Sequence, residues 1–129
     1  MDNALIAIRP AVKADLEPIL VIYNDAILNT TAVYDYEPHT LQMRTAWYEQ
    51  KLADGFPVFV AEINGKVCGF SSFGHFRSFA AYKYTVESSV YVSDQYRRKG
   101  IGKQLLTPLI ERAKEMQLHS LIAAIDASN

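Results

Sequence analysis

The chain has 129 residues, of which 50% are hydrophobic and 21% charged, and its formal net charge is −1. A chain of this length forms one domain with its own core, and the small net charge argues against a general attraction to nucleic acid or to an anionic membrane. No apolar run approaches the ~20 residues of a membrane span, no signal-peptide pattern opens the chain, and the single cysteine, Cys68, predicts buried filler without a disulfide in a reducing, cytoplasmic compartment.

The N-terminal part of the sequence predicts one strand followed by a helix. Leu5–Arg9 has a strand pattern that ends at Pro10, and apolar residues at helical spacing then predict a helix from near Asp15. Pro18 falls in the first turn of this helix, where a proline is tolerated. Asn29–Pro38 follows as a polar and aromatic loop.

A second helix is expected between Thr40, which can serve as its N-cap, and Asp54-Gly55, where a glycine can end it. Its helical spacing rests on five residues: Leu41, Arg44, Trp47, Tyr48 and Leu52. The dipeptide Asn64-Gly65 then predicts a two-residue hairpin turn between antiparallel strands.

The remaining elements complete a mixed α/β pattern. They are the strands Val58–Ile63, Lys66–Phe76, Val86–Val92 and Leu121–Ile125, and a helix at Gly100–Gln117. The last strand is apolar throughout, so we expect it to be buried on both faces and parallel to Val86–Val92. The order strand–helix–helix–strand–strand–strand–helix–strand predicts an α/β domain with a mixed sheet of the α+β type.

The Gly100–Gln117 helix has an apolar face and one irregularity. Pro108 should kink the helix or leave a carbonyl without its partner. The expected apolar face consists of Ile101, Leu105, Leu109, Ile110 and Ala113.

The start of this helix predicts an anion site. Gly100 and Gly102 let an anion approach backbone N–H groups at the positive end of a helix, and the preceding basic residues add charge. The motif reads Arg97-Arg98-Lys99-Gly100-Ile101-Gly102-Lys103. We interpret it as a cradle for a pyrophosphate, the alternative being a solvated helix start.

Two other phosphate-binding motifs share some features with this segment. A Walker P-loop is excluded, because Arg97 holds the place of its first glycine and Gln104 follows Lys103 where Ser or Thr is required. A dinucleotide-binding oxidoreductase is a rival, since Asp126 ends the next strand where a ribose-binding acid would lie. Against it, Leu105 replaces the third glycine of the fingerprint.

Glu87 is the candidate general base. Strand alternation puts Glu87 on one face together with Ser89 and Tyr91. A carboxylate in a central strand is costly unless it is paired or faces a wet cleft, and partial burial would raise its pKa towards neutrality. The alternatives are a glutamate on a solvated sheet face and a structural carboxylate paired with Arg77 or Lys83.

The aromatic and basic connection Arg77–Tyr84 is a candidate substrate loop. Arg77 can grip a carboxylate through two hydrogen bonds, and Phe79 and Tyr82 can wall a small pocket. An edge packed on a partner subunit and a surface for single-stranded nucleic acid are the alternatives, with nucleic acid last because of the net charge. The histidines His39, His75 and His119 show no ligand spacing, so no metal site is indicated.

The motif from Arg97 to Gly102 resembles the Arg/Gln-x-x-Gly-x-Gly/Ala motif of the GNAT superfamily of N-acetyltransferases. Within it, Thr85–Val92 is similar to the phosphinothricin and methionine sulfone/sulfoximine acetyltransferases. Arg77–Tyr82 and Ala123–Asn129 look similar too, so the resemblance spans nearly the whole chain. It implies a GNAT-like acyl-CoA N-acyltransferase fold, with acetyl-CoA as co-substrate and no metal.

The resemblance also implies roles for individual residues. Glu87 would be the base that deprotonates a small amino-acid-like amine, which then attacks the thioester directly. Cofactor contacts fall on Val90, Tyr91, Val92, Arg97, Arg98, Lys99, Gly100, Ile101, Gly102 and Lys103. Substrate contacts fall on Arg77, Phe79, Ala80, Ala81, Tyr82, Glu87 and Asn129.

One departure concerns the C-terminus. The family continues past the position of Asn129 with a helix and two more strands, which usually include a tyrosine or equivalent that protonates the leaving thiolate. The resemblance therefore implies a single N-acetyltransferase domain over 1–129 that is C-terminally incomplete, and a homodimer. A non-catalytic CoA-binding module remains an alternative.

Overall fold

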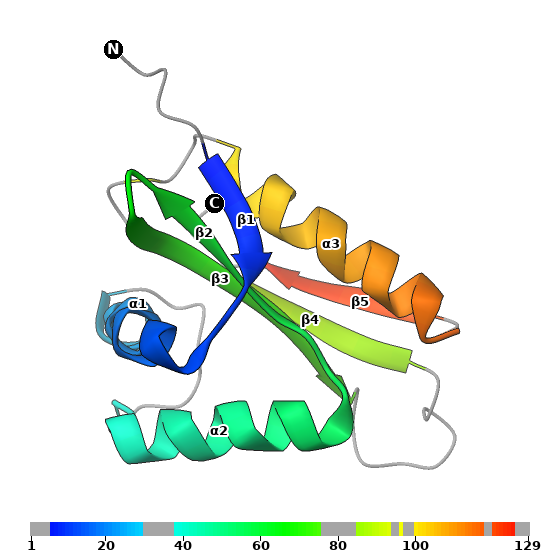
Figure 1. The fold of residues 1–129 in the computed structure, drawn as a ribbon, viewed down its shortest axis with the longest axis horizontal. Coiled ribbons are helices and arrows are strands. Elements are labelled where there is room, and N and C mark those ends of the chain that lie inside the picture. Colours follow the sequence, from blue (N-terminus) through cyan, green and yellow to red (C-terminus); the bar gives the residue numbers. More distant parts are fainter. Residues whose placement is uncertain are drawn as a thin grey trace.

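The predicted order of elements is confirmed in a computed structural model that describes residues 6–29, 38–75, 85–93, 96, 100–117 and 120–125 (Figure 1). The observed bounds lie within about two residues of the expected ones, as is usual for element ends. The elements are β1 (Ile6–Pro10), a short 3-10 turn η1 (Lys13–Asp15), α1 (Leu16–Asn29), α2 (Leu41–Asp54), β2 (Val58–Ile63), β3 (Lys66–His75), β4 (Thr85–Val92), α3 (Ile101–Glu115) and β5 (Ser120–Ile125).

The five strands form one mixed sheet in the order β1-β2-β3-β4-β5. The pairs β1–β2, β2–β3 and β3–β4 are antiparallel, and β4–β5 is parallel, as expected for a pair joined through a helix. Asn64 and Gly65 turn β2 into β3 with φ angles of 54° and 80°, the signature of the predicted hairpin. The pairing of β4 with β5 runs to Val90, while its pairing with β3 runs on to Val92.

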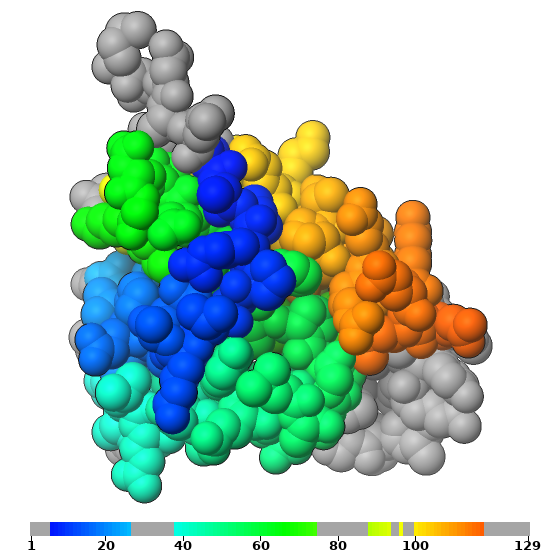
Figure 2. Space-filling model, in the orientation of Figure 1, coloured from blue at the N-terminus to red at the C-terminus, as the bar shows by residue number. Residues whose placement is uncertain are grey.

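The helices cover the two faces of this sheet unequally (Figure 1). α3 lies alone on one face, and α1 and α2 lie together on the other. In the space-filling view, β1 and η1 (blue) lie between α2 (cyan to green) and α3 (yellow to orange) (Figure 2). No helix in the described ranges is both long and apolar enough to cross a membrane.

The α3 face is an apolar core. Leu105 and Leu109 are fully buried, but Ile110, expected on the same side, is 40% exposed because the step from Leu109 turns it about 100° around the helix. Pro108 stays inside α3, and the Ser71 hydroxyl donates to the Leu105 carbonyl at 3.0 Å, close to where the proline removes a helical donor. Other buried residues here include Ala61, Cys68, Phe73, Val90, Val92 and Ile101.

Cys68 is buried filler, as predicted. Its thiol lies in the α3-side core with no exposed surface, and burial raises the pKa of this thiol. A thiol held neutral in this way is a poor nucleophile, so its contribution is packing.

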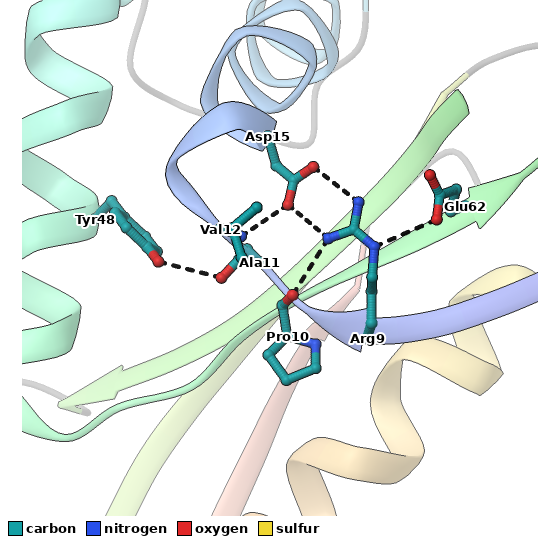
Figure 3. A network of polar contacts seen from close by, with 7 residues as sticks. All are labelled: Arg9, Pro10, Ala11, Val12, Asp15, Tyr48 and Glu62. Atoms are coloured by element: carbon teal, nitrogen blue, oxygen red, sulfur yellow. Dashed lines mark hydrogen bonds and ion pairs between the residues drawn. The ribbon is translucent and has the colours of Figure 1, made fainter. Parts of the chain in front are cut away.

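On the other face, α1 is tied to β1 by an ion-pair network (Figure 3). The Arg9 guanidinium donates to both carboxylate oxygens of Asp15, at 2.8 and 2.9 Å, and to Glu62 at 3.3 Å. Asp15 also accepts from the Val12 amide at 2.7 Å, so one carboxylate fixes both the strand end and the turn into α1. The arginine holds the pKa of Asp15 below its usual value.

The predicted caps of α2 are confirmed. The Thr40 hydroxyl accepts from the Met43 amide at 3.1 Å, and Gly55 ends the helix with a φ of 73°. The Tyr48 hydroxyl donates to the Ala11 carbonyl at 3.1 Å and fixes α2 against the β1–η1 corner (Figure 3). These contacts fix which face of α2 packs against the sheet.

Candidate active site

A pocket of about 330 Å³ lies between α1, α2 and the strands β3 and β4. Its walls are mainly aromatic, and two of its lining side chains carry positive charge. The lining residues are Tyr23, His39, Arg44, Trp47, Lys51, Phe70, Ser72, Phe73, Gly74, Ser89 and Tyr91. No carboxylate is among these described residues, so the pocket is suited to a small ligand with an anionic group.

Arg44 is a buried cation in the pocket wall, with 3% of its surface exposed. Its guanidinium carbon lies 3.8 Å from the centre of the Tyr23 ring and 4.6 Å from that of Trp47. Its Nε lies 3.2 Å from His39 Nδ1. Stacking on two rings offsets part of the desolvation of the charge, which explains how α2 can bury an arginine.

His39 is held in place by α1. The side chain of Asn24 accepts from the His39 amide at 2.8 Å and donates to its carbonyl at 3.0 Å. The His39 ring in turn lies 4.4 Å from the Tyr23 ring, centre to centre. The two helices are thus joined at the pocket through Asn24, His39 and Arg44.

Lys51 supplies the second positive charge. Its Nζ donates to the Phe73 carbonyl at 2.9 Å, which directs the ammonium towards β3. Burial, and to a lesser degree the charge of Arg44, lowers the pKa of Lys51, while Asp54 raises it. A bound anion would favour the charged form of this lysine.

β4 joins the pocket to the start of α3. Ser89 and Tyr91 line the pocket, whereas Val90, between them, faces the α3 side and lies near Gly102. Glu87 is two residues before Ser89, and its backbone is paired with Gly74, a pocket residue, and with Ile122. The described residues include the backbone of Glu87 but not its side chain, so its role as base stays a prediction.

The start of α3 is the segment that the sequence predicts as a pyrophosphate cradle. Gly100 caps the helix with a φ of 76° and offers no side-chain oxygen to the first amides. A methyl group on Gly102 would meet nothing closer than Val90 Cγ1 at 3.8 Å, so packing does not require a glycine there. Gln104 N bonds the Gly100 carbonyl at 3.2 Å, and the amides of Gly102 and Lys103 precede this bond. The glycine leaves room for an anion to approach these amides.

The other predicted cofactor residues differ in whether their backbone or their side chain could contact a cofactor. The side chains of Val90, Val92 and Ile101 belong to the buried core, so only their backbone groups are suited to a cofactor. Lys103 is exposed, and Tyr91 turns its ring to the pocket. The remaining predicted site residues lie outside the described residues: Arg77, Phe79, Ala80, Ala81, Tyr82, Arg97, Arg98, Lys99 and Asn129.

Sequence reasoning did not identify the α2 side of the pocket. Arg44 appeared only as one residue of a helical pattern, and Lys51 was not noted. A signal was present, because Arg44, Trp47, Tyr48 and Lys51 follow the i, i+3, i+4, i+7 spacing of one helix face. Two cations on the face that packs against a sheet indicate a polar pocket.

The described residues contain no cluster of three or more histidine, cysteine or acidic side chains that could hold a metal ion. The candidate site therefore consists of a cationic, aromatic pocket and a glycine-lined helix start, which meet at β4.

Comparison with known proteins gives a consistent result. The family model described as "Acetyltransferase (GNAT) family" matches residues 21–129. The chain is 48% identical over 124 residues to an L-methionine sulfoximine/L-methionine sulfone acetyltransferase of Pseudomonas paraeruginosa, with 95% of this chain and 72% of the relative covered.

Solved structures agree in fold. An N-acetyltransferase from Staphylococcus aureus is 54% identical, with a TM-score of 0.91 over 97% of this chain and 76% of that one. A GNAT superfamily phosphinothricin acetyltransferase from Sinorhizobium meliloti, in complex with acetyl-CoA, is 34% identical, with a TM-score of 0.89 over 96% and 68%. The GNAT-like fold predicted from the motifs is confirmed, and this chain belongs to the Acetyltransferase (GNAT) family of enzymes.

Proposed function

We propose that this chain transfers the acetyl group of acetyl-CoA to the amine of a small amino-acid-like substrate, of the methionine sulfone, methionine sulfoximine or phosphinothricin type. The relatives named for these substrates support the substrate class. The carrying observation is that one strand, β4, borders both the cationic pocket and the open helix start. Amine and thioester can thus reach each other across β4.

The chain's own groups divide the binding work. The amides at Gly100, Gly102 and Lys103 would hold the pyrophosphate, together with the basic residues Arg97–Lys99. Backbone groups of Val90–Val92 would pair with the pantetheine arm as an added strand does. Acetyl-CoA, when bound, supplies a thioester carbonyl carbon that an amine can attack.

Glu87 would act as the general base. It would take a proton from the substrate ammonium, through a water molecule, and so free the nitrogen lone pair for attack on the acetyl carbon. As the new C–N bond forms, the C–S bond breaks and CoA leaves as a thiolate, which takes up a proton as the attacking nitrogen loses its own. A backbone amide near Val90–Val92 would polarise the carbonyl during this change. In addition to the α2 side of the pocket, the predicted substrate contacts remain Arg77, Phe79, Ala80, Ala81, Tyr82 and Asn129.

A thiol-release assay with acetyl-CoA and a panel of amines tests this function. Thiol release is expected with methionine sulfone, methionine sulfoximine or phosphinothricin, and not without an amine. Glu87→Gln should leave CoA affinity nearly intact and lower kcat/KM by about 100-fold or more at neutral pH. CoA binding by calorimetry without thiol release from any amine would contradict the proposal and favour a non-catalytic CoA-binding module.

The homodimer implied by the resemblance and the cytoplasmic location inferred from the single cysteine remain predictions. Sedimentation of the purified chain would give the first, with a mass of twice 14.5 kDa as the expected result.

A further inference from the structure

The ammonium group of Lys51 lies at the pocket wall and has N–H donors beyond the one that bonds the protein. A lysine ammonium has three N–H donors, and the Nζ of Lys51 uses one of them for the Phe73 carbonyl. Within the described part of the chain, Lys51 has no second hydrogen-bond acceptor and no carboxylate at ion-pair distance. The rings of Trp47 and Phe56 lie 5.9 and 5.7 Å from this nitrogen. Its remaining N–H groups are therefore available to a ligand.

Gly74 leaves the space that this ammonium occupies. A methyl group built on Gly74 would lie 2.7 Å from Lys51 Nζ, so any side chain there would displace the lysine. Gly74 is also the register partner of Glu87 on β4. The ammonium thus lies beside the backbone pair that carries the predicted base.

The pocket contains a second cation on the same helix face. Arg44 precedes Lys51 by seven residues, two turns of α2, and both line the cavity. The charge of Arg44 disfavours the charged form of Lys51, and the described lining of the pocket has no carboxylate to offset the charge of Lys51. An anionic group of the substrate would do so.

We propose that Lys51, with Arg44 as the second cation, binds the α-carboxylate of the amino-acid substrate. This inference rests on the proposed function. The carboxylate is favoured over distal sulfone or phosphinate oxygens because it shares a carbon with the reacting amine, and Lys51 lies beside the Gly74–Glu87 pair where that amine would be deprotonated.

The test compares L-methionine sulfone with its carboxamide, which keeps the amine and the sulfone but has no carboxylate. Lys51→Met should raise KM for methionine sulfone by about 10- to 100-fold, the range for losing a charge-assisted hydrogen bond. KM for the carboxamide should stay nearly unchanged, and kcat should change less than KM. Lys66→Met, in the exposed β2–β3 hairpin, is the matched control and should leave both substrates unaffected.

Gly74→Ala is a second variant, which displaces the Lys51 ammonium without removing it. The added methyl group would push the Lys51 ammonium, which is the end of a flexible side chain, so the fold should be retained. We expect KM for methionine sulfone to rise selectively, as in Lys51→Met, but by a smaller factor. Thermal unfolding of all variants separates lost recognition from lost structure.

Four results would overturn the inference. One is an equal loss for both substrates. Another is a changed kcat and pH profile with unchanged KM, which would mean that Lys51 acts on Glu87. The third is selectivity for the carboxylate that is lost in Arg77→Met and not in Lys51→Met. The fourth is an effect of Lys51→Met on KM that disappears with norleucine, which has the carboxylate but no distal oxygens.

Binding and turnover are measured separately. Calorimetric titration of methionine sulfone into the wild type and Lys51→Met, without acetyl-CoA, tests carboxylate recognition alone. If the wild type binds methionine sulfone but releases no thiol, the proposed function fails while the inference on Lys51 is still decided by the variant's affinity.

Discussion

The two faces of the sheet are built from the same strands and do different things. On the α3 face, Leu105 and Leu109 pack without exposed surface. On the α1 and α2 face, an apolar cluster around Ile19 and Phe70 borders a pocket of about 330 Å³ that contains Arg44 and Lys51.

Strand alternation makes this division possible. Successive residues of β3 and β4 point to opposite faces, so Ser71 and Val90 serve the core while Ser72 and Ser89 line the pocket. Stability and recognition can then be changed almost independently. The following predictions test that separation, from the largest expected effect on stability to the smallest.

Leu105→Ala should give the largest loss of stability. Removing a fully buried leucine leaves a cavity under α3, at a cost of about 3 kcal/mol in the free energy of unfolding. Urea denaturation measures it. Leu52→Ala on α2, where the leucine is 60% exposed, is the matched control and should stay within about 0.5 kcal/mol. Similar losses for both would contradict the apolar core under α3.

Asp15→Asn tests the polar ties of the α1 face. It should lower stability at neutral pH by about 1–2 kcal/mol, because Arg9 loses its charged partner. The folded-state pKa of Asp15 lies below its ordinary value, so the wild type has this stability above about pH 4 and loses it as pH falls through the folded-state pKa.

Melting temperatures measured at decreasing pH should therefore converge for the wild type and Asp15→Asn in acid. Glu62→Gln, whose contact with Arg9 is longer at 3.3 Å, should have a smaller effect. A constant difference at all pH values would show that the ion pair is not the cause.

Ser71→Ala and Ser72→Ala compare neighbours that face opposite ways. Each hydroxyl donates to a carbonyl, Ser71 to Leu105 at 3.0 Å and Ser72 to Pro57 at 2.8 Å, and each loss should cost about 1 kcal/mol. Only Ser72→Ala should also change KM for the amine, since Ser72 lines the pocket. An equal change in KM for both would break the division between the faces.

Lys51→Met should leave stability unchanged or raise it, by about 1 kcal/mol at most, because the folded chain no longer desolvates an ammonium. Burial lowers the pKa of Lys51, so the wild type gains stability as pH rises from that folded-state pKa towards about 10.5, the value in the unfolded chain. The advantage of the variant should be largest at neutral pH and shrink in alkali, as followed by thermal unfolding. If the stability advantage of Lys51→Met grew in alkali, folding would raise the pKa of Lys51 and not lower it.

Gly102→Ala should have the smallest effect on stability, a gain of about 0.5 kcal/mol, because alanine favours the helix and finds open space. Its affinity for CoA, measured by calorimetry, should fall by about tenfold, since a methyl group blocks approach to the amides. Gly100→Ala, at a φ of 76°, should instead lose about 1 kcal/mol of stability. Unchanged CoA affinity in Gly102→Ala would contradict the proposed pyrophosphate site at the start of α3.

Most of the fold could be predicted from local patterns. The Asn64-Gly65 turn, the Thr40 cap and the Gly55 stop depend on the chemistry of a few adjacent residues, which acts the same way in any context. The parallel pairing of β4 and β5 followed from the helix between them. The exposure of Ile110 was missed, because spacing alone does not settle how wide the buried face of a helix is.

The glycine-rich start of α3 could likewise be located from the sequence, because its residues are contiguous. Its role as a phosphate site stays a prediction, which depends on backbone geometry that glycine permits. The pocket was not readable. Its walls come from α1, α2, β3 and β4. Only the tertiary structure brings Lys51 to the strand pair of Gly74 and Glu87 and Arg44 into the same pocket. A charge on a helix has no meaning as a site until packing decides which face is turned inward and which distant residues it meets there.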